Sequence, residues 1–188
     1  MTIDQRERSI RSFLAVPVTD EVAEPLMKSV ETSLEALPPL RQTARKNLHL
    51  TLVFLGSITE SALNDKLIPR VSELLRDAKP GRIHFRQVAG FPSGEAPKHL
   101  VLEGYGSPSV DALRQSLNEG LRELKTKEGG KDKAWRPHIT LGRFRERRTR
   151  PVAPTPWQVE LPVGQVILYE SETTLHGPVY RARHQWTL

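Results

Sequence analysis

Cysteine is absent from this chain of 188 residues. Without cysteine, the chain can form neither a disulfide framework nor a thiolate metal site. Long apolar runs are also lacking, since none approaches the roughly 20 residues that a helix needs to cross a bilayer. The beginning of the chain, MTIDQRERSIRS, is charged and lacks the apolar core of a secretion signal. The simplest expectation from these absences is a cytoplasmic protein that does not associate with a membrane.

The charge of the chain is unevenly distributed. Lys and Arg outnumber Asp and Glu by 28 to 22. The excess lies between Arg122 and Arg150, a segment with eleven basic and four acidic residues. A local positive field attracts polyanions and speeds their encounter. A solvated face that aids solubility has the same composition, so charge alone leaves both interpretations open.

Strand-like and helix-like segments alternate along the chain and predict one α+β domain over residues 1–188. Residues 12–18 and 47–56 have strand patterns. A helix is expected after Pro108, where a single apolar stripe contains Val110, Leu113, Leu117, Leu121 and Leu124. The segment RTRPVAPTP is expected to be an exposed, proline-rich connection. Because strand–helix–strand units recur, we expect two similar lobes, each with a small sheet and helices packed against it.

Two short segments look like versions of one another. They are LHLTL, residues 48–52, and PHITL, residues 137–141, and each has a histidine two positions before a threonine. Since side chains alternate between the faces of a strand, His49 and Thr51 share one face, and His138 and Thr140 share one face. The apolar residues of both segments point the other way. If the two lobes face each other, two imidazoles and two hydroxyls converge on one cleft.

Such a cleft suits in-line chemistry on a phosphodiester. The nucleophile and the leaving group lie on opposite sides of the phosphorus, which requires two separated catalysts. Two imidazoles can serve as general base and general acid, because histidine, with an ordinary pKa of about 6.5, holds either protonation state near neutral pH. The threonine hydroxyls could hydrogen-bond the phosphate oxygens and stabilise the charge that develops there.

Other chemistries find little support. Two histidines without a cluster of carboxylates or cysteines are an incomplete ligand set, so neither a metal nor a cofactor is expected. A serine nucleophile lacks its G-x-S-x-G element. One HxT segment alone is more often structural than catalytic, whereas two matched copies, one within the basic segment, favour catalysis. Four further histidines match neither copy and are interpreted as structural: His84, His99, His176 and His184.

Several segments of the chain resemble the two-histidine (2H) phosphoesterases and, among these, the bacterial LigT-like RNA 2′,3′-cyclic phosphodiesterases, also called 2′-5′ RNA ligases. The segments are RSFLAVPV, NLHLTLVFLG, AGFPSGEAPKHLVLEG, WRPHITLGR and LYESETTLHGPVYRARHQWTL, and they span nearly the whole chain. The resemblance implies a bilobal fold with pseudo-twofold symmetry. Each lobe would contribute one HxTx motif, residues 49–52 and 138–141, to a cleft between two antiparallel sheets.

The resemblance also implies an activity and roles for individual residues. The activity is hydrolysis of a 2′,3′-cyclic phosphate at an RNA end to a 2′-phosphomonoester without a metal. His49 would be the proton donor to the departing 3′ oxygen, and His138 the proton acceptor that activates water. Thr51 and Thr140 match the motif threonines and would hold the phosphate. Arg143 lies where relatives often carry a basic residue near the phosphate.

Several alternatives stay open at the level of the sequence. The reverse reaction would join RNA through a 2′-5′ link and would use the same residues. A non-catalytic module could hold a nucleotide or an RNA end in the same cleft, although both motifs are complete. The expected partners are RNA with 2′,3′-cyclic phosphate ends, including tRNA halves, or small cyclic nucleotides, and the expected state is a monomer. The basic stretch at residues 143–150 favours a substrate with more than one phosphate.

Overall fold

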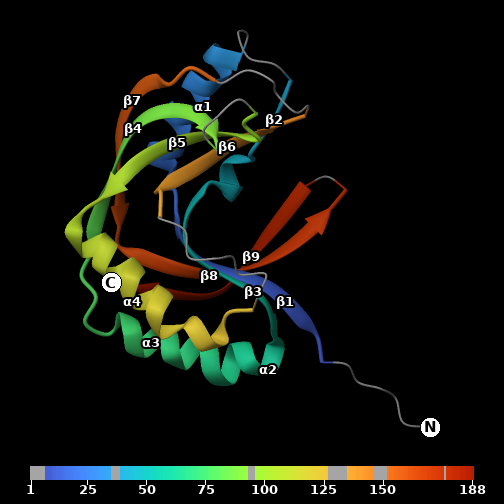
Figure 1. Ribbon diagram of the computed structural model, residues 1–188, viewed down its shortest axis with the longest axis vertical. Coiled ribbons are helices and arrows are strands. Elements are labelled where there is room, and N and C mark those ends of the chain that lie inside the picture. The colour runs from blue at the N-terminus through green and yellow to red at the C-terminus, as the bar shows by residue number, and fades with distance from the viewer. Residues whose placement is uncertain (1–6, 35–38, 93–95, 127–134, 146–151, 176) are drawn as a thin grey trace.

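The structure is a computed structural model that describes residues 7–34, 39–92, 96–126, 135–145, 152–175 and 177–188. Nine strands occur in these residues: β1 Ser9–Pro17, β2 Leu40–Gln42, β3 His49–Thr59, β4 Gly81–Phe91, β5 His99–Gly106, β6 His138–Phe144, β7 Thr155–Val163, β8 Gln165–Thr174 and β9 Gly177–Thr187. They form one sheet in the order β7-β4-β5-β6-β3-β1-β8-β9, with β2 paired to β6 (Figure 1). The strand pairs are antiparallel.

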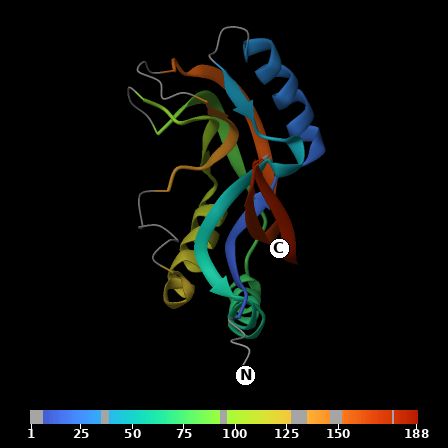
Figure 2. The same ribbon diagram turned by 90° about the vertical axis from the view of Figure 1, so that its right-hand side faces the viewer.

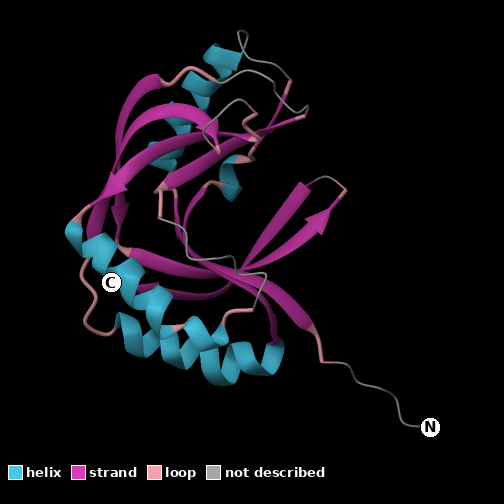
Figure 3. Ribbon diagram, viewed as in Figure 1, coloured by secondary structure: helices cyan, strands magenta, loops and turns pink. Residues whose placement is uncertain are grey.

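The helices gather at two ends of the curled sheet (Figures 2 and 3). Their bounds are α1 Asp20–Leu34, α2 Glu60–Ala62, α3 Ile68–Leu75 and α4 Pro108–Gly120, with a π-helical turn at Leu63–Leu67 and 3₁₀ turns at Arg45–Asn47 and Arg122–Leu124. The helix α1 lies at one end, near β7, whereas α2, α3 and α4 lie together at the other. Within the described residues, no helix is both long and apolar enough to cross a membrane.

The core fills the space between the helices and one face of the sheet. The apolar stripe of α4 is buried as its spacing predicts, with Val110 and Leu117 fully enclosed. The central strands β3 and β6 contribute Leu50 and Ile139, which are also fully buried. The opposite face of these two strands is therefore left for polar side chains.

The strand order is symmetric about the contact between β3 and β6. The first half of the sheet contains β3, β1, β8 and β9, and the second half contains β6, β5, β4 and β7. In each half the central strand pairs with a strand that comes earlier in the chain, and an α-helix lies between the two in sequence. This helix is α1 between β1 and β3, and α4 between β5 and β6. The predicted α+β class is confirmed. The two small sheets expected from the sequence are instead one continuous sheet, and the division into two lobes stays a prediction.

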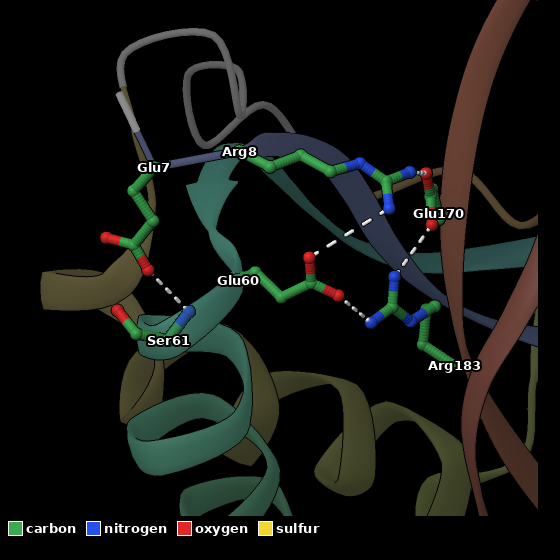
Figure 4. A network of polar contacts seen from close by, with 6 residues as sticks. All are labelled: Glu7, Arg8, Glu60, Ser61, Glu170 and Arg183. Carbon is green, nitrogen blue, oxygen red and sulfur yellow. Dashed lines mark hydrogen bonds and ion pairs between the residues drawn. The ribbon is translucent and has the colours of Figure 1, made fainter. Parts of the chain in front are cut away.

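An ion-pair network holds the first half of the sheet to α2 (Figure 4). The buried carboxylate of Glu170, on β8, accepts hydrogen bonds from Arg8 and, at 2.9 Å, from Arg183 on β9. Arg183 also donates to Glu60, in the first turn of α2, at 2.5 Å. Because a buried carboxylate is costly without partners, two guanidinium groups offset its desolvation. The network joins β8 and β9 to α2 and to Arg8, the residue before β1.

Two strands depart from the sequence prediction. The expected connection RTRPVAPTP covers residues 148–156, of which 148–151 lie outside the described residues. Its last two residues, Thr155 and Pro156, already belong to β7. Prolines are tolerated there because β7 is the edge of the sheet, where a missing backbone N–H breaks few ladder hydrogen bonds. The short strand β2 was also missed, since three residues carry too little periodicity to predict a strand.

Candidate active site

The two HxT segments lie side by side at the centre of the sheet. Leu50 of β3 is the ladder partner of Ile139 of β6. Directly paired residues point to the same face, so the residues before and after them point to the other. We call this other face the motif face. Four half-buried side chains define it: His49, Thr51, His138 and Thr140. The structure thus brings together the four motif residues that the sequence singled out.

The two imidazoles are oriented in the same way. Nδ1 of His49 lies 2.7 Å from the carbonyl oxygen of Asn47, and Nδ1 of His138 lies 2.7 Å from that of Arg136. A carbonyl oxygen only accepts hydrogen bonds, so Nδ1 carries the hydrogen in both rings. The other ring nitrogen, Nε2, is left to accept or release a proton. Both histidines therefore present the same atom for proton transfer.

The two carbonyl groups that orient the imidazoles are themselves held in place. The side-chain amide of Asn47 donates to the carbonyl of Pro178, on β9, at 3.0 Å. Arg136 forms an ion pair with Glu103, on β5, and its guanidinium lies 5.2 Å from the ring centre of Phe91. The sequence prediction treated Asn47 as a strand-start residue. Its contacts make it a positioning residue for His49.

His49 lies among aromatic rings. Its ring centre is 4.9 Å from that of Phe13 and 5.1 Å from that of Tyr180, which it meets edge-on. Burial lowers the pKa of His49, and the nearby His138 lowers it further, while the hydrogen bond to Asn47 acts in the opposite direction. The neutral form of His49 is therefore favoured in the free protein. His138 has a different neighbour, since Phe91 stacks on its ring at 4.5 Å.

A β-bulge follows each motif at the same position. In β3 the bulge leaves Leu52 without a ladder partner, and in β6 it leaves Leu141 without one. Because an extra residue resets the alternation of side chains, the residue three positions after each threonine returns to the motif face. These residues are Phe54 in β3 and Arg143 in β6. Strict alternation would have placed Arg143 on the buried face.

The two residues after the bulges differ in chemistry. Phe54 pairs with Phe13 and leaves 54% of its surface exposed, which is unusual for so large an apolar side chain. Arg143 is exposed and pairs with His99, on β5. The sequence prediction included Arg143, did not single out Phe54, and interpreted His99 as structural. The signal for Phe54 was its place, since it follows its HxT segment by the same number of residues as Arg143.

The remaining histidines and the basic segment are placed only in part. His84 forms an ion pair with Glu160 at 3.0 Å, and the ring of His184 packs against Trp186. His176 lies outside the described residues, as do residues 127–134 and 146–151 of the basic segment. Among the residues that the structure describes, no group of three or more His, Asp or Glu is arranged to hold a metal ion.

The fold and the motif face define a class of protein. The resemblance to the 2H phosphoesterases implies one HxTx motif from each half of a pseudo-symmetric antiparallel fold, and each half of the curled sheet contributes one HxT strand. The sequence model of the 2′-5′ RNA ligase superfamily matches residues 18–174. The chain belongs to this family, and the predicted resemblance is confirmed.

Individual relatives cover almost the whole chain. The RNA 2′,3′-cyclic phosphodiesterase of Thermus thermophilus is 32% identical over 95% of this chain and 90% of its own length. The crystal structure of TT0787 from the same organism has a TM-score of 0.82 at 30% identity and covers 95% of this chain and 98% of its own. The crystal structure of E. coli LigT complexed with 3′-AMP has a TM-score of 0.67 at 24% identity, covers 96% of this chain and 98% of its own, and supports the fold.

Proposed function

We propose that this enzyme hydrolyses 2′,3′-cyclic phosphates at the ends of RNA to 2′-phosphomonoesters. The observation that carries the proposal is the pair of imidazoles, held on one face of the sheet with both Nδ1 atoms bound to carbonyls and both Nε2 atoms left for proton transfer. The name of the T. thermophilus relative, an RNA 2′,3′-cyclic phosphodiesterase, supports this substrate class. DNA ends are excluded by chemistry, because the cyclic phosphate requires a ribose 2′-OH.

The proposed reaction is a single in-line displacement. Nε2 of His138 takes a proton from water as the water oxygen bonds to phosphorus. The bond between phosphorus and the 3′ oxygen breaks, and Nε2 of His49 gives its proton to that oxygen. The product carries the phosphate on its 2′ oxygen. Exchange of one proton with solvent at each histidine then restores the starting state, and no step requires a metal ion.

The proton on His49 has to be present before the reaction. Burial lowers the pKa of His49 in the free protein and disfavours this state. A bound phosphate diester is an anion, and an opposite charge nearby favours the protonated imidazole. Substrate binding therefore supplies the charge that the free site lacks.

The remaining residues of the motif face would hold the substrate. The hydroxyls of Thr51 and Thr140 flank the two imidazoles and would donate to the non-bridging phosphate oxygens. The exposed ring of Phe54 offers a surface on which a base can stack. Arg143 would bind a phosphate of the substrate. Since both HxT strands belong to one chain, a monomer over residues 1–188 would contain the complete site.

The identity of the product tests the proposal. Adenosine 2′,3′-cyclic phosphate is incubated with the protein, and the products are separated by chromatography against 2′-AMP and 3′-AMP standards. We expect 2′-AMP alone, at a rate unchanged by EDTA. Formation of 3′-AMP would contradict the assigned leaving group, and complete loss on chelation would contradict the metal-free mechanism. Tight binding without any product would favour the alternative, a nucleotide-binding module.

A further inference from the structure

A row of basic and hydrogen-bonding side chains crosses β5, β6 and β2. Arg143, on β6, is the ladder partner of Arg41, on β2, and of His99, on β5. Ladder partners point to the same face, so all three side chains lie on the motif face that the β6 bulge restores for Arg143. We call Arg41, Arg143 and His99 the basic row.

The basic row lacks acidic partners. Both arginines are exposed, and within the described part of the chain neither forms an ion pair with a carboxylate. Like charges placed directly opposite each other in a sheet are destabilising. Several other arginines of the sheet are matched with carboxylates, as Arg82 is with Glu160 at 2.7 Å. The guanidinium of Arg41 lies against Gly177, at the start of β9, and an anion bound between the two arginines would offset their like charges.

His99 adds a hydrogen-bond donor to this row. Its Nδ1 is buried and has no hydrogen-bond partner among the described residues. A hydrogen on that atom would be a buried donor without an acceptor, which is costly, so the tautomer with the hydrogen on Nε2 is favoured. This is the reverse of the tautomer of His49 and His138. Burial, followed by the charges of Arg143, His138 and Lys98, lowers the pKa of His99 and keeps this imidazole neutral.

The row lies beside the catalytic pair, but not on top of it. On β5, His99 is two residues from Val101, the ladder partner of Thr140. Two residues of a strand span about 7 Å. This separation is comparable with the spacing of neighbouring phosphates along an RNA strand. When the threonines hold one phosphate, the basic row would therefore face the next phosphate along the RNA.

We propose that the basic row is a subsite for a second phosphate, the phosphodiester on the 5′ side of the terminal nucleotide of an RNA end. The proposal rests on the proposed function, because it takes the cyclic phosphate to lie between His49 and His138. It specifies the substrate class: an RNA end has this second phosphate, and a cyclic mononucleotide lacks it. The row would thus make the enzyme prefer RNA ends over cyclic mononucleotides.

The test compares two substrates that differ in this phosphate. Adenosine 2′,3′-cyclic phosphate is the mononucleotide, and ApA ending in a 2′,3′-cyclic phosphate is the dinucleotide. We expect kcat/KM to be at least about tenfold higher for the dinucleotide, mainly through KM. His99→Phe places at this position the residue that the first half of the sheet has at Phe13, and Arg41→Gln removes one charge. Each should lower the dinucleotide preference about three- to tenfold.

Two further variants distinguish an effect of the basic row from the general effect of a substitution on the enzyme. Arg82→Gln removes an exposed arginine from β4 without touching the row and should leave the preference unchanged. His99→Gln keeps a side-chain donor and should restore part of the preference lost in His99→Phe. The affinity of Arg41→Gln for the dinucleotide should also depend less on salt. The slope of log affinity against log salt should be reduced by about 0.7, the value for one lost phosphate contact on a single strand.

The outcomes distinguish this proposal from the proposed function. An unchanged preference in both row variants, or equal losses on both substrates, overturns the second-phosphate subsite. If the unaltered protein turns over neither substrate, the proposed function fails, and the row is tested by calorimetric binding of 2′-AMP and of ApA 2′-phosphate. Tighter binding of the dinucleotide that is lost in Arg41→Gln supports the subsite, and equal binding of both probes overturns it.

Discussion

The two halves of the sheet share a backbone and differ in the side chains around the motif. Each half has an HxT strand with a bulge after the threonine, and each bulge turns one more residue onto the motif face. In the first half the row across the strands is Phe54, Phe13 and Tyr169; in the second half it is Arg143, His99 and Phe91. The symmetric backbone places the catalytic groups, and the asymmetric rows give the site a direction.

The difference between the rows assigns different tasks to the two ends of the site. Aromatic rings near His49 suit a nucleoside, whose base stacks and whose 3′ oxygen receives the proton. Cationic and donor groups beyond His138 suit a phosphate chain. A symmetric site would accept a substrate in either orientation. Substitutions can alter either the residues that the two halves share or the residues in which they differ.

Removal of either imidazole should have the largest effect. His49→Gln and His138→Gln should each lower kcat for adenosine 2′,3′-cyclic phosphate by about 10³-fold, since a positioned general acid or base typically contributes roughly 10² to 10⁴. Steady-state rates measured by chromatography check this. His184→Gln, a change at a histidine of β9 that packs against Trp186, serves as the control. An active His138→Gln protein would show that the second HxT segment is structural.

Removal of a threonine hydroxyl should have the next largest effect on kcat. Thr51→Val and Thr140→Val keep the shape of the side chain and remove the hydroxyl, and each should lower kcat by about 10²-fold, the effect of one lost donor to a developing oxyanion. Thr→Ser at the same positions should retain most of the activity. Comparable losses in the Ser and Val variants would indicate that packing, and not the hydrogen bond, is what matters.

Phe54, whose counterpart in the second half is Arg143, should affect substrate binding more than the catalytic step. Phe54→Ala should raise KM about tenfold with little change in kcat, because stacking of one base contributes roughly 1–3 kcal/mol. Phe54→Trp should keep KM low. If kcat falls instead and KM stays constant, the ring shapes the catalytic groups and does not hold the base.

The smallest expected effect is a shift in pH dependence. His49, the proposed proton donor, has a pKa below the ordinary 6.5. As pH rises through this lowered pKa, His49 loses its proton, so the alkaline limb of kcat/KM should begin on the acidic side of 6.5. Titration of the His49 ring by NMR should give a midpoint below 6.5 in the free protein and a higher one with bound 2′-AMP. A midpoint above 6.5 in the free protein would contradict this account.

The sequence predicted the parts of the site that follow from simple alternation. The period of two placed His49 with Thr51 and His138 with Thr140, and the apolar stripe predicted α4. Alternation could not reveal the bulges at Leu52 and Leu141, because a bulge depends on the pairing of two strands distant in sequence. For that reason the sequence did not single out Phe54.

Other features of the fold and the site depend on contacts between residues that are distant in the sequence. The role of Asn47 follows from a carbonyl that orients His49 and an amide that binds β9, and no local pattern predicts a contact with Pro178. The edge position of β7 explains prolines that by themselves indicate a connection. The two HxT segments are alike and do not by themselves distinguish the donor histidine from the acceptor, so the assignment of His49 as donor came from the resemblance alone.

We propose that each HxT segment is half of one catalytic site. The most direct test is kcat of the double variant, His49→Gln with His138→Gln, beside both single variants. Residues that act as a unit are strongly non-additive, so removing the second histidine after the first should cost little. We expect kcat of the double variant to lie within about threefold of that of the slower single variant. A double variant whose loss equals the product of the two single losses would contradict it.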